Sequence, residues 1–212
     1  MSAPTARTSA PAQAQAPQRQ PDFGAEVASP DAHRLVRWVV ASADNGTHPF
    51  VVLDKRQARV YVFEPAGRLI AATPALLGYA QGDDSVPGIG ERPIEAVRPE
   101  ERTTPAGRFV ASVGRNLQGE DVVWVDYDAA VSMHRLRLNT PSERRAERLA
   151  SPTAEDNRIS YGCVNLPVAF FEQVLWPTMH QRPGIVYVLP EHKSMESVFP
   201  ALATHGRAST LI

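Results

Sequence analysis

The period of the hydrophobic positions changes early in the chain, and the change separates a helix from a series of strands. In residues 31–42 the apolar residues Leu35, Trp38 and Val39 recur at helical spacing, directly after the sequence SPD at 29–31. A Ser-Pro start followed by this spacing is typical of an amphipathic helix. We expect this helix to pack on the outside of the strands that come after it in the chain.

From residue 49 onward, short runs rich in Val and aromatic residues are separated by polar turns. Apolar runs at 50–53 and 60–63, with a third strand at 68–73 after a Pro-Ala-Gly turn, predict a β-meander. Further strands are predicted over residues 107–114, 120–127, 130–138 and 184–190. The pattern therefore predicts a mostly β fold, a sandwich or mixed sheet, with a few short helices.

One of those helices follows the single cysteine of the chain. Residues 168–179, VAFFEQVLWPTM, begin after Pro167 and contain Pro177, which we expect to end the helix. The stretches 79–106 and 139–158 show no regular pattern, and long irregular loops in a compact domain are usually functional or disordered.

The two ends of the chain differ from its middle. Residues 1–28 are rich in Ala, Pro and Gln and bury too little apolar surface to order, so they predict a disordered tether. Residues 29–195 form the predicted catalytic domain, with an insertion at 139–157, and residues 196–212 are a predicted loose tail. Tethers of this kind often follow a removed signal or anchor, so we expect an exported, periplasmic protein.

Bulk charge and cysteine content exclude several classes of protein. The formal net charge of −1 does not indicate a nucleic-acid partner, and no stretch approaches the roughly 20 apolar residues of a membrane-spanning helix. A single Cys cannot form an internal disulfide, so its thiol stays free.

Cys163, in the sequence RISYGCVNLP, is either a small buried core residue or a nucleophile. Its place after Gly162 and shortly before a predicted helix favours the nucleophile, because a helix start and free backbone N–H groups stabilise negative charge. Acyl transfer by a thiol also needs a base. Among six histidines, His134 differs in lying within an alternating apolar strand, where it is either solvent-facing or the base for Cys163.

The sequence SYGCVN at 160–165 resembles the signature of L,D-transpeptidases, the YkuD-type enzymes that cross-link peptidoglycan. The residues that match are Ser160, Gly162, Cys163 and Asn165. The sequence TTPAGRF at 103–109 and the hairpin opening at residue 50 also resemble that family, so the likeness runs in order over about residues 50 to 190. Tyr161 departs from the pattern, since the family has His there, and the interval from His134 to Cys163 is longer than is usual.

The resemblance implies a cysteine acyltransferase without metal or cofactor. Cys163 would attack the stem tetrapeptide and form a thioester, His134 would act as base, and an amine of a second stem would resolve the thioester. Gly162, Tyr161, Ser160 and Asn165 would form the oxyanion pocket or position groups, while Arg137, Asn139, Arg144 and Arg145 would bind substrate. The resemblance also implies a role in peptidoglycan biosynthesis, cell-wall organization and cell shape. It further implies inhibition by carbapenem-type β-lactams.

Several alternatives stay open from the sequence. The cross-link is of 3-3 or 1-3 type. On the same scaffold, water could resolve the thioester, which would make the protein a carboxypeptidase or amidase. Loss of competence through Tyr161 would leave a non-catalytic wall-binding module. The insertion at 139–157 is either a solvated surface segment or a cover over the cleft whose arginines meet substrate carboxylates.

Overall fold

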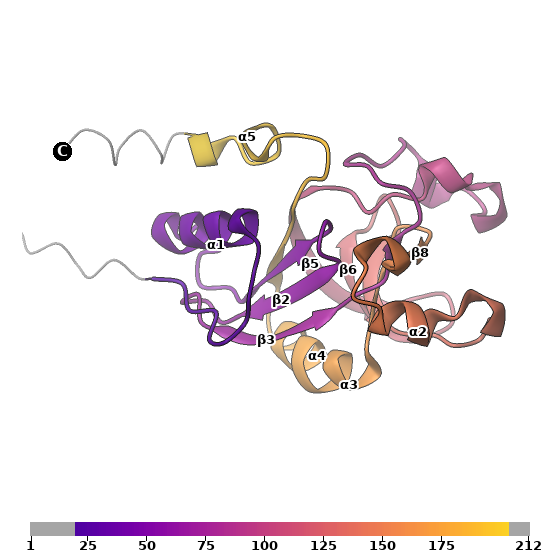
Figure 1. Cartoon of the computed structure of the whole chain (residues 1–212), viewed down its shortest axis with the longest axis horizontal. Helices are drawn as coiled ribbons and strands as arrows, with labels where there is room; N and C mark the ends of the chain where they lie inside the picture. Colours follow the sequence, from indigo (N-terminus) through magenta and orange to yellow (C-terminus); the bar gives the residue numbers. More distant parts are fainter. Residues whose placement is uncertain (1–19, 204–212) are drawn as a thin grey trace, which may run out of the picture.

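The computed structural model describes residues 20–203, which form one large mixed sheet with short helices around it (Figure 1). Eight strands lie in the order β3-β2-β1-β10-β5-β6-β7-β9. The pairs β1–β10 and β7–β9 are parallel and the other neighbours are antiparallel. A short parallel pair, β4 (Leu77–Gly78) and β8 (Arg158–Ser160), stands beside this sheet. The prediction of a mostly β domain is confirmed.

The strands of the large sheet are β1 (Phe50–Asp54), β2 (Arg59–Phe63), β3 (Leu69–Pro74), β5 (Gly107–Arg115), β6 (Asp121–Asp126), β7 (Val131–Arg135), β9 (Val164–Leu166) and β10 (Gly184–Val188). The helices are α1 (Pro30–Ser42), α2 (Arg145–Ala150), α3 (Val168–Phe170), α4 (Trp176–His180) and α5 (Met195–Val198). Short 3₁₀ turns cover Ile89–Glu91, Ile94–Ala96, Pro99–Glu101, Pro141–Glu143 and Ala154–Asn157. Each predicted strand is present, although β7 is shorter than the predicted 130–138.

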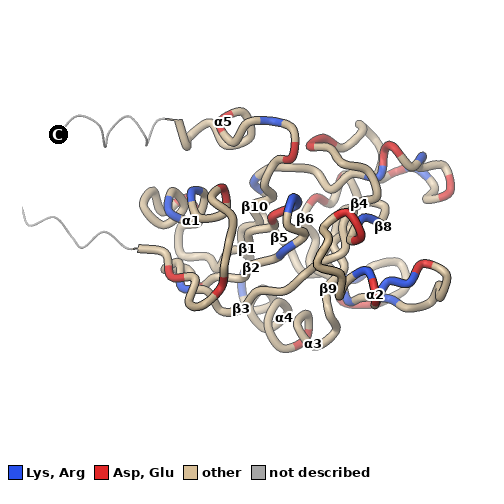
Figure 2. The backbone as a smooth tube through the Cα atoms, in the orientation of Figure 1, with Lys and Arg blue, Asp and Glu red and all other residues tan. Residues whose placement is uncertain are grey.

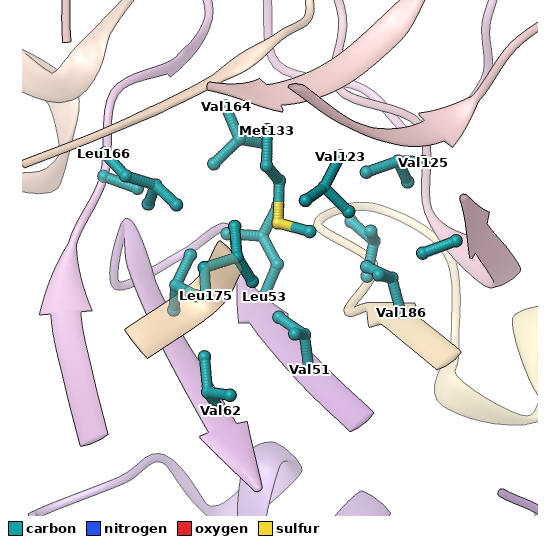
Figure 3. Packing of buried hydrophobic residues seen from close by; sticks show 14 of the residues in the cluster. Val51, Leu53, Val62, Val123, Val125, Met133, Val164, Leu166, Leu175 and Val186 are labelled. Carbon is teal, nitrogen blue, oxygen red and sulfur yellow. The ribbon is translucent and has the colours of Figure 1, made fainter. Parts of the chain in front are cut away.

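Central strands are buried on both faces, which explains their unbroken apolar sequences. In β1, Val51 and Leu53 pack into one cluster with the helices α3 and α4, while Phe50 and Val52 pack into a second cluster beneath α1. Figure 3 shows the first cluster, where Met133 of β7 meets side chains from β1, β9 and β10. The sheet thus separates two cores, and β7 contributes to the first.

Three predictions about helices and ends need correction. The helix after Pro167 does not end at Pro177: a π-helical turn, Phe171–Leu175, precedes α4, and Pro177 lies in the first turn of α4. A wider turn tolerates the missing N–H of a proline that would interrupt a regular α-helix.

The predicted tether and tail are also shorter than expected. Phe23 is buried against the second core, and Asp22 bridges to Arg68, so residues 20–28 belong to the domain. Met195, Phe199 and Leu202 are buried in the same core, so the part of the predicted tail up to residue 203 packs on the domain. Residues 1–19 and 204–212 lie outside the described residues.

Candidate active site

Cys163 lies in a tight loop between β8 and β9 that its own hydrogen bonds hold. The Ser160 hydroxyl donates to the Cys163 carbonyl at 2.6 Å and accepts from the Gly162 N–H at 3.1 Å. One serine therefore fixes both sides of the turn that presents the thiol. Cys163 itself is half-buried, neither sealed in a core nor fully exposed.

Gly162 is required by geometry at this turn. Its φ of +125° is a conformation that side chains rarely adopt, and an added Cβ would stand 2.7 Å from the carbonyl oxygen of Thr103. Its carbonyl accepts from the Thr104 hydroxyl at 2.8 Å, and that hydroxyl in turn accepts from the Gly78 N–H at 2.9 Å. The segment at 103–109 that resembles the family thus contacts the Cys163 loop directly.

A buried ionic cluster supports the same threonine. The Lys55 ammonium donates to the Thr104 carbonyl and to Asp83 Oδ1, each at 2.9 Å, and its side chain is fully buried. Burial alone would raise the pKa of Asp83, but the backbone N–H groups of residues 191–193 and Lys55 lower it well below its usual range. Asp83 therefore carries a negative charge that offsets the buried ammonium.

The pairing of β7 with β9 brings the predicted base to the same face as the thiol. Met133 pairs with Val164, and both side chains lie in the core. Because side chains alternate along a strand, the residues before and after them face the opposite way. Accordingly the Ser132 hydroxyl lies 3.7 Å from the Cys163 sulfur, and His134 pairs with Asn165 one step further along that face.

The backbone holds His134 in one tautomer. Its Nδ1 lies 2.8 Å from the carbonyl oxygen of Arg135, which can only accept, so Nδ1 carries the proton and Nε2 keeps a free lone pair. Burial is the main cause that lowers the pKa of His134, and the Arg137 and Arg145 guanidinium groups lower it further, against the Arg135 carbonyl and Glu120. The imidazole is therefore neutral near pH 7 and able to accept a proton.

The hydrogen-bond partners of the Cys163 sulfur among residues 20–203 are Ser132 and the Ala130 carbonyl, the latter at 3.5 Å, and not the His134 ring. Adjacent strands lie about 4.8 Å apart and two residues along a strand span about 6.6 Å. Thiol and imidazole are diagonal neighbours at this spacing. Hydrogen bonds between catalytic groups are often long in the absence of substrate and tighten only once it binds.

Both side chains line a cavity of about 450 Å³. Trp124 pairs with Ser132 across β6 and β7, so the indole and Ala130 stand at the level of the thiol. The other lining residues extend past His134 toward the end of β7. The residues that line that far end are Asn116, Leu117, Gln118, Arg137, Asn139, Thr140, Glu143 and Arg145.

The inserted segment contributes directly to this cavity. The basic residues of the insertion lie in helix α2 and at the position directly before it, and Figure 2 shows basic residues along α2. The Arg145 guanidinium donates to the buried Asn165 side chain at 2.8 Å and to Glu143 at 2.5 Å. Arg144, in contrast, has a left-handed backbone (φ +50°), pairs with Glu147 and does not line the cavity.

The other predicted site residues lie around the thiol in different roles. Arg137 pairs with Glu120 at the cavity wall, and Asn139 lines the wall beside it. The Asn165 amide donates to the Cys163 carbonyl at 3.4 Å. The Tyr161 ring lines the cavity and lies 3.8 Å below the Arg102 guanidinium.

Two predicted contributions to thiol activation are wrong. Strand β9 stands between Cys163 and α3, so the thiol does not lie at a helix N-terminus. The Gly162 N–H already donates to Ser160 and is not a free oxyanion donor. Among residues 20–203 the N–H of Cys163 itself has no hydrogen-bond acceptor, which leaves it as the donor beside the sulfur.

Sequence reasoning missed three residues of this site. Ser132 stands two positions before His134, so strand alternation alone could have placed it on the same face. Thr104 lies inside the segment that resembles the family, but its contact with Gly162 depends on the folded chain. The place of Trp124 depends on the register of β6 against β7. Within the described range, no group of three or more His, Cys, Asp or Glu side chains could hold a metal ion.

No protein-family model and no curated protein sequence matches the chain. Solved structures that it resembles include an L,D-transpeptidase from Xylanimonas cellulosilytica (15% identity, TM-score 0.41, 68% of this chain and 61% of that one). The helical cell shape determining protein Pgp2 from Campylobacter jejuni is another (14% identity, TM-score 0.43, 85% and 64%). The catalytic domain of the E. faecium L,D-transpeptidase is a third (14% identity, TM-score 0.39, 68% and 98%). The chain thus spans less than two thirds of the first two proteins.

Proposed function

We propose that this protein is a cysteine acyltransferase that cross-links peptidoglycan stem peptides, in the manner of an L,D-transpeptidase. One observation carries the proposal. Cys163 and His134 lie on the same face of two paired strands, line one cavity, and the imidazole is held with Nε2 free. The sequence SYGCVN and the segment at 103–109 identify the chemistry to which that geometry is suited.

In the proposed reaction His134 Nε2 takes the proton of the Cys163 thiol. The sulfur attacks a carbonyl carbon of a stem tetrapeptide, the S–C bond forms, and the C–N bond to the terminal D-Ala breaks. His134 returns the proton to the departing amine. An amine of a second stem then attacks the thioester while His134 accepts its proton. The new amide C–N bond forms, the C–S bond breaks, and His134 passes the proton to the departing sulfur, which regenerates the thiol.

The oxyanion of each tetrahedral intermediate would lie against the Cys163 N–H. Removal of one such donor typically costs about 2.7–4 kcal/mol of transition-state stabilisation. A carbapenem would acylate the same sulfur. Because peptidoglycan lies outside the cytoplasm, the proposal also implies that the protein acts outside the cytoplasm. In residues 20–203, no helix has the length and apolar character needed to cross a membrane.

The test is incubation of the purified protein with tetrapeptide muropeptides, followed by mass spectrometry of the products. Cross-linked dimers support the proposal, and fragmentation of the dimer distinguishes a 3-3 from a 1-3 bond. Tripeptides alone would show hydrolysis on the same scaffold instead. Cys163→Ala is the matched control, since it removes only the sulfur, and it should abolish product formation.

Thiol reactivity separates catalysis from wall binding alone. We expect iodoacetamide and a carbapenem each to add one adduct to the wild-type protein and none to Cys163→Ala. If neither reagent modifies the wild-type thiol near neutral pH, the protein is a binding module and the proposal is wrong.

A further inference from the structure

The cavity continues past His134, on the side away from the thiol, into an end with paired charges. Along the shared face of β7 and β9, Cys163 stands at the level of Ser132, and His134 with Asn165 comes next. The Arg145 guanidinium donates to Asn165 at 2.8 Å, which anchors it at the level of the imidazole. Glu143 and Arg137 line the same end.

The two arginines at this end are held but not saturated. Arg145 uses one nitrogen on Glu143 and another on Asn165, and its side chain is only 15% exposed. Arg137 pairs with Glu120 from the β5–β6 hairpin. A guanidinium carries five N–H donors in a planar fork, so each of them keeps donors for a further acceptor. Both arginines line the same cavity as His134, and Arg145 bonds to Asn165, the residue that pairs with His134.

Proton transfer decides which part of a substrate occupies this end. The base that takes the thiol proton must return it to the departing amine, so that nitrogen comes within hydrogen-bond distance of His134 Nε2. Whatever is attached to the nitrogen extends beyond the imidazole, while the acyl part stays near Cys163, Ala130 and Trp124. The charged end therefore receives the amine component, both when it leaves and when its replacement enters.

We propose that the inserted pair Arg145 and Glu143 forms the subsite for this amine component, with Arg145 binding the free carboxylate of the departing terminal amino acid. This inference rests on the proposed function and deepens it. A carboxylate matches the planar fork of Arg145 in geometry and charge, whereas a carboxamide does not. Glu143 beside it keeps the guanidinium oriented and disfavours acceptors that carry a second anion at that point. The insertion then confers selectivity for stems that end in a free acid.

The experiment compares two tetrapeptide stems, one ending in D-Ala and one in D-Ala carboxamide, and measures kcat/KM for release of the terminal residue. Wild-type protein should prefer the free acid by about tenfold or more, the effect of one charge-assisted hydrogen bond. Arg145→Gln should lower that ratio to about one, chiefly through the free acid. The ratio within one variant does not depend on the fraction of active protein, so partial misfolding does not imitate the result.

Arg144→Gln is the matched control. Arg144 is the neighbour of Arg145 in the chain, but its guanidinium pairs with Glu147 and does not line the cavity. That variant should keep the wild-type ratio. If Arg145→Gln also keeps it while stems are still processed, the subsite assignment is wrong and the proposed function stands. If wild-type protein releases nothing from either peptide, the proposed function is wrong and this inference fails with it.

Discussion

Thr104 connects the Cys163 loop to the rest of the domain, and removal of its hydroxyl tests how that loop is held. Its hydroxyl donates to the Gly162 carbonyl at 2.8 Å and accepts from the Gly78 N–H at 2.9 Å, and the residue is 1% exposed. Substitution Thr104→Val keeps the shape of the side chain and deletes only this hydroxyl. Both backbone partners then remain buried without a partner.

The expected cost follows from those two bonds. A neutral hydrogen bond contributes about 0.5–1.5 kcal/mol, and a buried group left unsatisfied costs about 1–3 kcal/mol. We therefore expect Thr104→Val to lower the free energy of unfolding by about 2–4 kcal/mol, after the small gain from an added methyl group. The neighbouring change Thr103→Val is a matched control, because that hydroxyl makes one bond, to the Asp84 carbonyl at 2.6 Å. It should cost about 1 kcal/mol.

Urea unfolding followed by circular dichroism measures both variants, with the m-value checked for constancy. The rate of iodoacetamide labelling at Cys163 reports on the loop in the same samples. We expect labelling to change in Thr104→Val and to stay close to wild type in Thr103→Val. Equal and small costs for the two variants would refute the view that Thr104 anchors the loop.

Three further predictions concern the base, the glycine and the buried ion cluster. Arg137→Gln removes a cation that lowers the pKa of His134, so the acidic limb of the kcat/KM profile should move to higher pH, and an unmoved limb would argue against His134 as the base. In Gly162→Ala the added Cβ meets the Thr103 carbonyl and the backbone keeps a disfavoured φ, so the variant should lose about 1–3 kcal/mol of stability and most thioester formation. Thermal unfolding measures the stability, and mass spectrometry of the acyl-enzyme measures the thioester. Retention of both would show that the turn adapts. Asp83→Ala leaves the buried Lys55 ammonium with only Glu191, 3.6 Å away, as an anionic partner, and leaves the backbone N–H groups of residues 191–193 without their acceptor. It should cost about 3–5 kcal/mol in urea. Because the pKa of Asp83 in the folded state lies below its unfolded value, its charge stabilises the fold above about pH 4 and loses that effect in acid. The difference in the free energy of unfolding between Asp83→Ala and wild type should therefore narrow in acid and not at neutral pH.

Much of the fold followed from periodicity because its strands are local signals. The apolar runs of β1 and β2 are separated by a short polar turn, so each strand could be predicted without knowing its neighbour. The order of the strands could not. β10, near the end of the chain, lies between β1 and β5, a placement set by long-range pairing that sequence spacing does not report.

The ends of the domain were misjudged for a related reason. Residues 20–28 and 196–203 show no helical or alternating pattern of apolar positions, yet single residues such as Phe23 and Phe199 fill the second core. One aromatic side chain buries enough apolar surface to order a short segment around it. Average composition does not detect such an anchor, whereas α1, with several apolar residues on one face, was detected.

Within the site, residues close to Cys163 in sequence could be predicted and those brought by tertiary pairing could not. Ser160 and Asn165 contact the Cys163 carbonyl, as their proximity in the chain suggests. Ser132 depends on strand alternation and Thr104 on a loop from another part of the chain. Arg144 and Arg145 are adjacent and chemically identical, yet the left-handed backbone at Arg144 directs the two to different surroundings.

The same distinction explains why Tyr161 is compatible with the proposed catalysis. Tyr161 lies in the turn before Cys163, and its ring stacks below Arg102 and lines the cavity. The imidazole with a free Nε2 belongs to His134 of β7. A change at 161 therefore alters the cavity wall, whereas the tautomer of His134 is set by the Arg135 carbonyl. In the proposed reaction, activation of the thiol would depend on the pairing of β7 with β9 and on the threonine that supports Gly162, and neither of these contacts involves the side chain at 161.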